Sequence, residues 1–289
     1  MNGILLIDKP SGWTSSDVVA KLRGILHERR IGHSGTLDPM ATGLLVVFVG
    51  RATRAVEFAE AQEKQYLAGL RLGLVTDTQD TTGTRIGGES REVTDEELSA
   101  ALDRFRGEIQ QIPPMYSAIK IGGKKLYEIA RRGVEVERKA RAVTISELEL
   151  LDREGEECSL RVTCSKGTYI RTLCHDIGQV LGCGGCMSSL RRSRAGIFSL
   201  ADAHSLEEVQ QAADRGTAEK LLLPTDALFS EHPILRVSER EEARIRNGNS
   251  ISSDEPDGMY RVYGPQGDFL ALAKVEGREL KTIKSFFEV

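Results

Sequence analysis

The longest apolar run in the chain is LLVVFV at residues 44–49, and its length decides what it can form. Six residues are far short of the roughly 20 that a membrane-spanning helix needs, but they suit a buried strand. The run GILLID at residues 3–8 also reads as a buried strand, and it ends at the breaker-rich turn KPSG, residues 9–12. The sequence therefore predicts a sheet buried in a soluble domain, with no membrane span.

Helices are predicted at three capping boxes, where a Ser or Thr precedes an acidic residue by three positions. Apolar residues then recur at helical spacing, as in the stripe Leu98, Leu102, Phe105 and Ile109, and again over residues 170–181. Further strands are expected at residues 64–72, 141–151 and 158–164. Residues 29–43 and 76–83 lack a steady period and read as loops. The three capping pairs are Thr14 with Asp17, Thr94 with Glu97, and Ser205 with Glu208.

The pattern of predicted secondary structure changes after His232-Pro233. Short strand-like pieces cut by Gly, Asp and Asn follow, whereas longer helical and strand segments precede. At 289 residues the chain is also long for a single core. We therefore expect an α+β domain over residues 1–231 and a small β-rich domain over residues 232–289.

The net charge of −4 conceals a segregated charge distribution. Residues 147–157 hold six carboxylates against Arg153, whereas residues 113–141 hold eight cations against three Glu. Such segregation favours a polyanion-binding face on an acidic body, with unrelated solvated helix faces as the alternative. The basic segment lies between breakers and is expected to project. Its cations are Lys120, Lys124, Lys125, Arg131, Arg132, Arg138, Lys139 and Arg141.

The five cysteines predict neither a disulfide framework nor a metal centre. Their number is odd, in a chain large enough to bury a core. Cys183 and Cys186 form one CxxC motif, but a zinc site needs about four ligands and a redox site a thioredoxin-like context. His175 is the only histidine nearby. We expect reduced thiols in a Gly-rich turn.

The strongest candidate for chemistry is the glycine-rich segment GHSGTLDP, which contains Asp38. Glycines let a backbone approach a ligand closely, and a carboxylate in such a loop can act as base or nucleophile. The alternative is an ordinary Asp-Pro turn. Motifs for phosphate-binding loops, dinucleotide binding, zinc proteases and serine hydrolases are absent from the sequence, and the five histidines are scattered.

The segment around Asp38 resembles the signature loop of the TruB-type pseudouridine synthases, whose aspartate is the catalytic nucleophile. Four other segments resemble motifs of the same family and follow in the family's order. The resemblance implies a mixed, largely antiparallel sheet with the active-site cleft across its middle, followed by a PUA-like β-barrel that binds RNA. The five segments are LIDKPSGW (6–13), GHSGTLDPMATGLL (32–45), KQYLAGLRLG (64–73), CSKGTYIRTL (164–173) and LGCGGCMSSLRR (181–192).

The resemblance also implies a role for individual residues. Arg171 would pair with Asp38 and hold its orientation, and Tyr66 would stack on the target base and relay a proton. His33 would fill the stack that the flipped base vacates, and Tyr169 and Leu190 would line the uracil pocket. Without the resemblance, these side chains would read as core or surface residues. The RNA phosphates would be contacted by Lys9, Lys64, Lys120, Lys124, Arg131, Arg132 and Arg141.

The implied reaction is the isomerisation of uridine to pseudouridine at position 55 in the T-loop of tRNA, with no cofactor and no metal. Whether Asp38 attacks the ribose or the base, or takes a ribose proton, stays open. Two alternatives are an RNA-binding or tRNA-folding factor on the same scaffold, and the guide-RNA-dependent branch of the family; a CxxC redox protein is a third. We expect a cytoplasmic protein that does not associate with a membrane, since the N-terminus carries no export signal. We also expect a monomer without an obligatory protein partner, because the sequence shows no heptad seam and no large apolar surface stripe.

Overall fold

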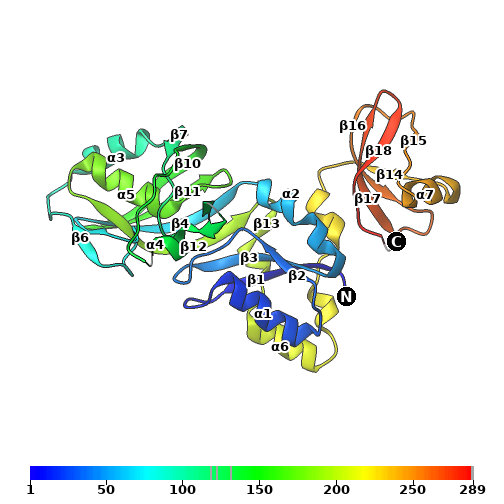
Figure 1. The fold of residues 1–289 in the computed structure, drawn as a ribbon, viewed down its shortest axis with the longest axis horizontal. Helices are drawn as coiled ribbons and strands as arrows, with labels where there is room; N and C mark the ends of the chain where they lie inside the picture. Colours follow the sequence, from blue (N-terminus) through cyan, green and yellow to red (C-terminus); the bar gives the residue numbers. More distant parts are fainter. Residues whose placement is uncertain (118, 122, 131, 288–289) are drawn as a thin grey trace.

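A single large sheet organises the first 200 residues of the computed structural model, which describes residues 1–117, 119–121, 123–130 and 132–287 (Figure 1). All of its pairings are antiparallel except that of β12 with β3, where only Arg191 and Arg192 face Thr42 and Gly43. The expected largely antiparallel sheet is therefore confirmed. Its order is β1 (Gly3–Lys9), β3 (Thr42–Val49), β12 (Gly185–Ala195), β4 (Lys64–Leu72), β11 (Glu157–Cys164), β10 (Arg141–Glu154) and β7 (Gly107–Gln111), with β2 (Ile31–Ser34) on β3 and β13 (Phe198–Ser199) on β12.

The short β3–β12 junction divides the sheet into two halves, each with its own helices and core. Helices α1 (Ser15–Leu26) and α6 (Leu206–Asp214) pack on the β1–β3 half, and α5 (Ile170–Leu181) and α3 (Asp95–Asp103) pack on the β4–β11 half. All three predicted capping boxes are confirmed at the starts of α1, α3 and α6. The junction lies inside the sheet, with β1 and β3 on one side and β12, β4, β11, β10 and β7 on the other.

Two sequence expectations for this domain are wrong in detail. Residues 29–43 are not all loop, because Ile31–Ser34 form strand β2, which pairs with β3. The glycines in this segment hide the strand because they interrupt its alternation of apolar and polar residues. The stripe from Leu98 to Ile109 is not one helix, because α3 ends at Asp103 and Gly107 turns the chain at a φ of 85° into β7. Ile109 still packs against the core, but from a strand.

The basic segment emerges between two paired strands, β7 and β10. It carries the hairpin β8 (Lys120–Ile121) and β9 (Lys124–Lys125), followed by α4 (Leu126–Ala130). It is therefore an insertion at one edge of the sheet. The remaining short elements are β5 (Val75–Thr76), β6 (Arg85–Gly87), α2 (Val56–Ala61) and the 3₁₀ helices Gly50–Ala55, Leu200–Asp202, Ala218–Leu221 and Thr225–Phe229.

The C-terminal residues form a separate five-stranded sheet, drawn in orange and red at one end of Figure 1. Its core is its own, but an aromatic group joins it to the larger domain: Phe229 lies 6.2 Å from Phe269 and 5.9 Å from Phe286, ring centre to ring centre. Its helix α7 (Glu239–Arg246) is not predicted from the sequence. The strand order is β14 (Ile234–Arg236), β16 (Gly258–Tyr263), β17 (Phe269–Glu276), β18 (Glu279–Ser285) and β15 (Ile251–Ser252).

All five cysteines are free and buried. Burial raises the pKa of Cys158, Cys164 and Cys186 to about 11, so these thiols are protonated and unreactive at neutral pH. Cys186 lies on β12 rather than in the turn that the CxxC motif suggests. Among the described residues no cluster of three metal-ligating side chains is present, and no described helix is long and apolar enough to cross a membrane.

Asp176, on α5, makes the stability of the fold depend on pH. Burial raises the pKa of its carboxyl to about 6. Because the folded-state pKa exceeds the unfolded value of about 3.9, ionisation costs stability as the pH rises from about 4 through 6. Asp176→Asn is expected to raise the free energy of unfolding by about 1–2 kcal/mol at pH 8, discounted for partial exposure, and to change it little at pH 4. Urea unfolding at the two pH values measures this, with exposed Asp268→Asn as control; an equal gain at both pH values would contradict it.

Candidate active site

The loop between β2 and β3 presents Asp38 at the junction of the two halves of the sheet. Its neighbours fix the loop on both sides: Leu37 is buried and donates its N–H to Ser15 Oγ (2.9 Å), and the carbonyl of Pro39 accepts from the N–H of Gly12 (2.8 Å). The Asp38 side chain itself is 35% exposed. The backbone is therefore held while the carboxylate stays open to a ligand.

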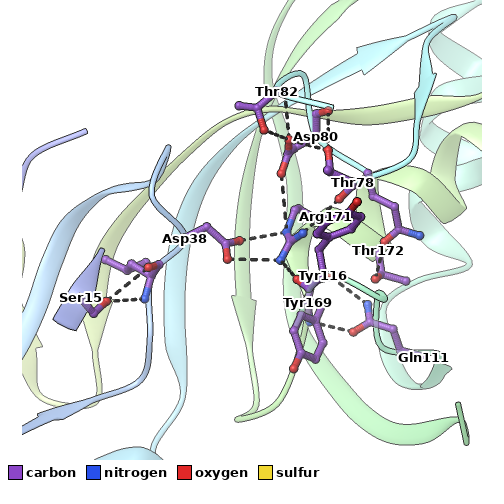
Figure 2. A network of polar contacts seen from close by, with 12 residues as sticks. Ser15, Asp38, Thr78, Asp80, Thr82, Gln111, Tyr116, Tyr169, Arg171 and Thr172 are labelled. Atoms are coloured by element: carbon purple, nitrogen blue, oxygen red, sulfur yellow. Dashed lines mark hydrogen bonds and ion pairs between the residues drawn. The ribbon is translucent and has the colours of Figure 1, made fainter. Parts of the chain in front are cut away.

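Arg171 reaches the Asp38 carboxylate from the opposite half of the sheet. It lies in the first turn of α5, with its side chain 6% exposed. Its Nε lies 2.9 Å from Asp38 Oδ2 and its Nη2 donates to Oδ1 at 3.2 Å. Figure 2 shows this two-pronged contact, which fixes both the position and the plane of the carboxylate.

Arg171 also donates to two backbone carbonyls. Nη1 donates to the carbonyl of Thr78 (3.1 Å) and Nη2 to that of Tyr116 (2.7 Å). Thr78 lies in the loop after β5, and Tyr116 lies at the start of the basic insertion. Arg171 therefore joins the loop of Asp38, a second loop and the base of the insertion at one point.

A second carboxylate, Asp80, also lies near Arg171 (Figure 2). Its Oδ2 lies 3.9 Å from Arg171 Nε, and its Oδ1 accepts from the hydroxyls of Thr78 (2.8 Å) and Thr82 (2.5 Å). The preceding Gln79 has a φ of 63°, a left-handed conformation uncommon for a non-glycine residue. Residues 76–83 were expected to form only a loop, and the signal for this contact was their content of two Asp and four Thr in eight residues.

Tyr66 and Leu190 lie beside this centre on adjacent strands. Leu190 is 8% exposed and pairs with Ala68 of β4, and Tyr66 is two residues before Ala68 on the same strand. Both belong to the hydrophobic cluster that includes Leu37. Burial raises the pKa of Tyr66, while the Arg192 guanidinium opposes that shift, so the phenol is protonated at neutral pH. The two strands thus place apolar side chains next to the Asp38 carboxylate.

Tyr169 and His33 flank the centre from the two halves. Tyr169 is the N-cap of α5, and its backbone N–H and C=O both pair with the side-chain amide of Gln111 (2.7 and 3.0 Å). His33 is half-buried on β2, and burial lowers its pKa, as does the charge of Arg192. The structure therefore brings Asp38 and Arg171 into contact and places Tyr66, Leu190, Tyr169 and His33 on the elements around them.

Family models match most of the chain. The N-terminal domain of the TruB family of pseudouridylate synthases matches residues 23–170. The chain belongs to the TruB family of pseudouridine synthases. Two C-terminal models of the same family, described as those of tRNA pseudouridylate synthase B and tRNA pseudouridine synthase II, match residues 171–230 and 232–287. The resemblance drawn from the sequence motifs is therefore confirmed, and the chain is an isomerase of the pseudouridine synthase class.

Curated relatives share the whole length of this TruB-family chain. The tRNA pseudouridine synthase B of Syntrophomonas wolfei is 45% identical over 98% of this chain and 96% of its own length. That of Clostridium kluyveri is 41% identical over 99% and 100%. Among solved structures, a Cbf5-Nop10-Gar1 complex aligns with a TM-score of 0.76 at 26% identity, over 99% of this chain and 85% of that chain. The fold of this chain, a mixed sheet with helices followed by a small PUA-like domain, is therefore shared with that solved structure.

Two of the expected phosphate contacts of this TruB-family chain are wrong. Lys9 is fully buried, and its Nζ donates to the carbonyls of Trp13 (2.6 Å), Pro10 (2.9 Å) and Pro39 (3.4 Å). Lys64 is also buried and donates to carbonyls at the C-terminal end of α2, including that of Glu60 (2.6 Å). Burial lowers the pKa of each ammonium group to about 8. Because both side chains are buried, they do not face a phosphate at the surface. Their hydrogen bonds hold backbone carbonyls in place instead.

The other expected phosphate contacts lie in or beside the basic insertion. Arg132 and Arg141 are exposed, as a phosphate contact requires. Arg131 and the side chains of Lys120 and Lys124 lie outside the part of the chain that the structure describes.

Asp80→Asn is expected to slow isomerisation about 10–100-fold, equivalent to about 1.4–2.8 kcal/mol of activation free energy. The substitution keeps an oxygen for Thr78 and Thr82 but removes the charge next to Arg171, so the arginine is free to shift relative to Asp38. Single-turnover rates measure the effect. Asp77→Asn is the matched control, because Asp77 is exposed on the same loop and its side chain accepts from the N–H of Thr84 (2.8 Å). Equal rates for the two variants would contradict the prediction.

Proposed function

We propose that this chain isomerises uridine to pseudouridine at position 55 in the T-loop of tRNA, with Asp38 as the nucleophile and without a cofactor or metal. The single observation that carries the proposal is the contact of the partly exposed Asp38 carboxylate with the buried Arg171 in a TruB-family chain. Nε and Nη2 of the arginine lie 2.9 and 3.2 Å from the two carboxylate oxygens. The full-length similarity to proteins named tRNA pseudouridine synthase B supports tRNA as the substrate.

The reaction balances with the side chains at hand. The bond between N1 of uracil and C1′ of ribose breaks, the base turns, and a bond between C5 and C1′ forms. The proton on C5 is then lost and N1 gains one, so no oxidant or reductant is consumed. Asp38 opens the reaction, and Arg171 holds its carboxylate in one orientation, aimed at the nucleotide.

The target base must leave the RNA stack to reach Asp38. In this proposal Tyr66 stacks on the flipped uracil and relays the C5 proton, and Tyr169 and Leu190 complete the pocket. His33, held neutral by burial, fills the vacated place in the stack. Arg132, Arg141 and the insertion contact phosphates, so affinity for tRNA weakens with salt.

The proposal assigns residues 1–231 to catalysis and residues 232–289 to RNA binding. The second sheet, with a core of its own, supports that division. We further propose a cytoplasmic enzyme that works as a monomer and needs no protein partner.

Release of tritium from an unmodified tRNA transcript labelled at C5 of uridine tests the substrate and the chemistry. Purified protein with chelator and reductant is expected to release one tritium per tRNA. The same assay on a ribosomal RNA fragment tests the alternative of the guide-RNA-dependent branch. Release from neither RNA without added proteins, or binding of tRNA with no release, would overturn the proposal.

A further inference from the structure

Arg192 is the most deeply buried arginine near the active site. It lies on β12 at the junction of the two halves and is 1% exposed. Its Nε donates to the carbonyl of Leu44 (2.7 Å) and its Nη2 to that of Gly35 (3.0 Å). Within the described part of the chain, no carboxylate lies within ion-pair distance of it. A buried charge without a carboxylate partner in that part of the chain is costly, so its place in the fold calls for an explanation.

The two carbonyls that Arg192 binds stand at the two ends of the Asp38 loop. Gly35 is the first residue after β2, and Leu44 follows the start of β3. The loop glycines are also shaped by this arginine: a Cβ at Gly35 would lie 3.2 Å from Arg192 Nη1, and one at Gly43 would lie 2.4 Å from the Arg192 carbonyl oxygen. Both glycines have positive φ, 78° and 96°. Arg192 therefore contacts the backbone at both ends of the loop that carries Asp38.

Arg192 is also the direct cross-strand partner of Tyr66. The β12–β4 register places the two residues opposite each other, so their side chains leave the sheet on the same face. The charge of Arg192 is the largest influence that opposes the burial-driven rise in the pKa of Tyr66. One guanidinium thus touches the loop of Asp38 and faces the strand of Tyr66.

We propose that Arg192 is a positioning residue of the isomerisation, which fixes the loop that carries Asp38 against the strand that carries Tyr66. The inference rests on the proposed function. Charge-assisted hydrogen bonds in a buried setting are strong and directional, so they hold the loop more rigidly than its own turn does. Because Arg192 is buried, it does not contact tRNA directly. Its loss should therefore lower the rate of isomerisation of the bound nucleotide and leave the affinity for tRNA unchanged.

Arg192→Lys tests the proposal, with Arg191→Lys as the matched control. The neighbouring Arg191 has a 42% exposed side chain and pairs with Asp8 (2.7 Å). We expect Arg192→Lys to lower the single-turnover rate about 10–100-fold and to leave Kd for tRNA close to wild type, because lysine lacks the two separate nitrogens, Nε and Nη2, with which arginine reaches the two carbonyls in a fixed geometry. Arg191→Lys should leave the rate close to wild type. Equal rates in the two variants, or a loss explained by weaker Kd, would overturn the proposal.

A second background separates positioning from general damage to the fold. In Tyr66→Phe, the further loss caused by Arg192→Lys should be much smaller than in wild type, because the pair acts together; additive losses would count against the proposal. If Arg192→Lys does not fold, Gly35→Ala keeps the charge and presses a methyl group toward Nη1, with the same loss of rate and unchanged Kd expected. Wild-type turnover of tRNA is measured first: its absence would sink the proposed function and this inference together, whereas its presence with equal variant rates would sink this inference alone.

Discussion

Asp38→Asn should abolish pseudouridine formation, with a loss of at least about 10³-fold in the single-turnover rate. The amide has the shape of the carboxylate, so it can stay beside Arg171, but it is neither a nucleophile nor a base. Since the loop is held by Leu37 and Pro39 and not by the carboxylate, the fold and the binding of tRNA should be retained.

Filter binding and thermal unfolding of Asp38→Asn supply the controls for that loss. Retained binding with no product would assign Asp38 to the chemical step. A tRNA-folding benefit that persists without product would show that the second role considered for this scaffold is real. A variant with more than a tenth of the wild-type rate would contradict the nucleophile assignment.

Arg171→Lys should lower the rate by about 10²-fold or more, although the charge is kept. A lysine cannot make the two-pronged contact with Asp38 and also reach the carbonyls of Thr78 and Tyr116. The carboxylate would therefore lose its fixed plane, and the base of the insertion would lose its anchor.

Arg161→Lys is the matched control for this substitution. Arg161 forms a surface ion pair with Glu149, which contributes little to stability and lies outside the centre. Single-turnover rates of the two variants, measured with saturating enzyme, give the comparison. A rate for Arg171→Lys within a few-fold of that for Arg161→Lys would show that charge alone suffices.

Local signals in the sequence predicted much of the fold. A capping box satisfies orphan N–H groups within four residues, so the starts of α1, α3 and α6 needed no tertiary information. The strand Ile31–Ser34 was missed because its pairing with β3 is not a local property. The helix expected to run to Ile109 ended early, since apolar spacing cannot show where a glycine will turn the chain into a strand.

The residues of the candidate site were predicted mainly from their resemblance to family motifs, and less from their chemistry and spacing. Asp38 and Arg171 are 133 residues apart in sequence, and only the folded sheet brings them together. Lys9 and Lys64 were misassigned because a lysine looks the same in a sequence whether it faces water or caps buried carbonyls. Asp80 and Arg192 were missed for a related reason: their importance lies in contacts with distant backbone and charge, which no local pattern records.

The most direct test of the central claim maps the modified nucleotide. Wild-type protein and Asp38→Asn are incubated with an unmodified tRNA transcript in chelator, and pseudouridine is located by carbodiimide-blocked primer extension. We predict a single new stop that reports position 55 with wild type, and none with the variant. A stop at another position would contradict the proposed substrate, and a stop at 55 that persists in Asp38→Asn would contradict the proposed nucleophile.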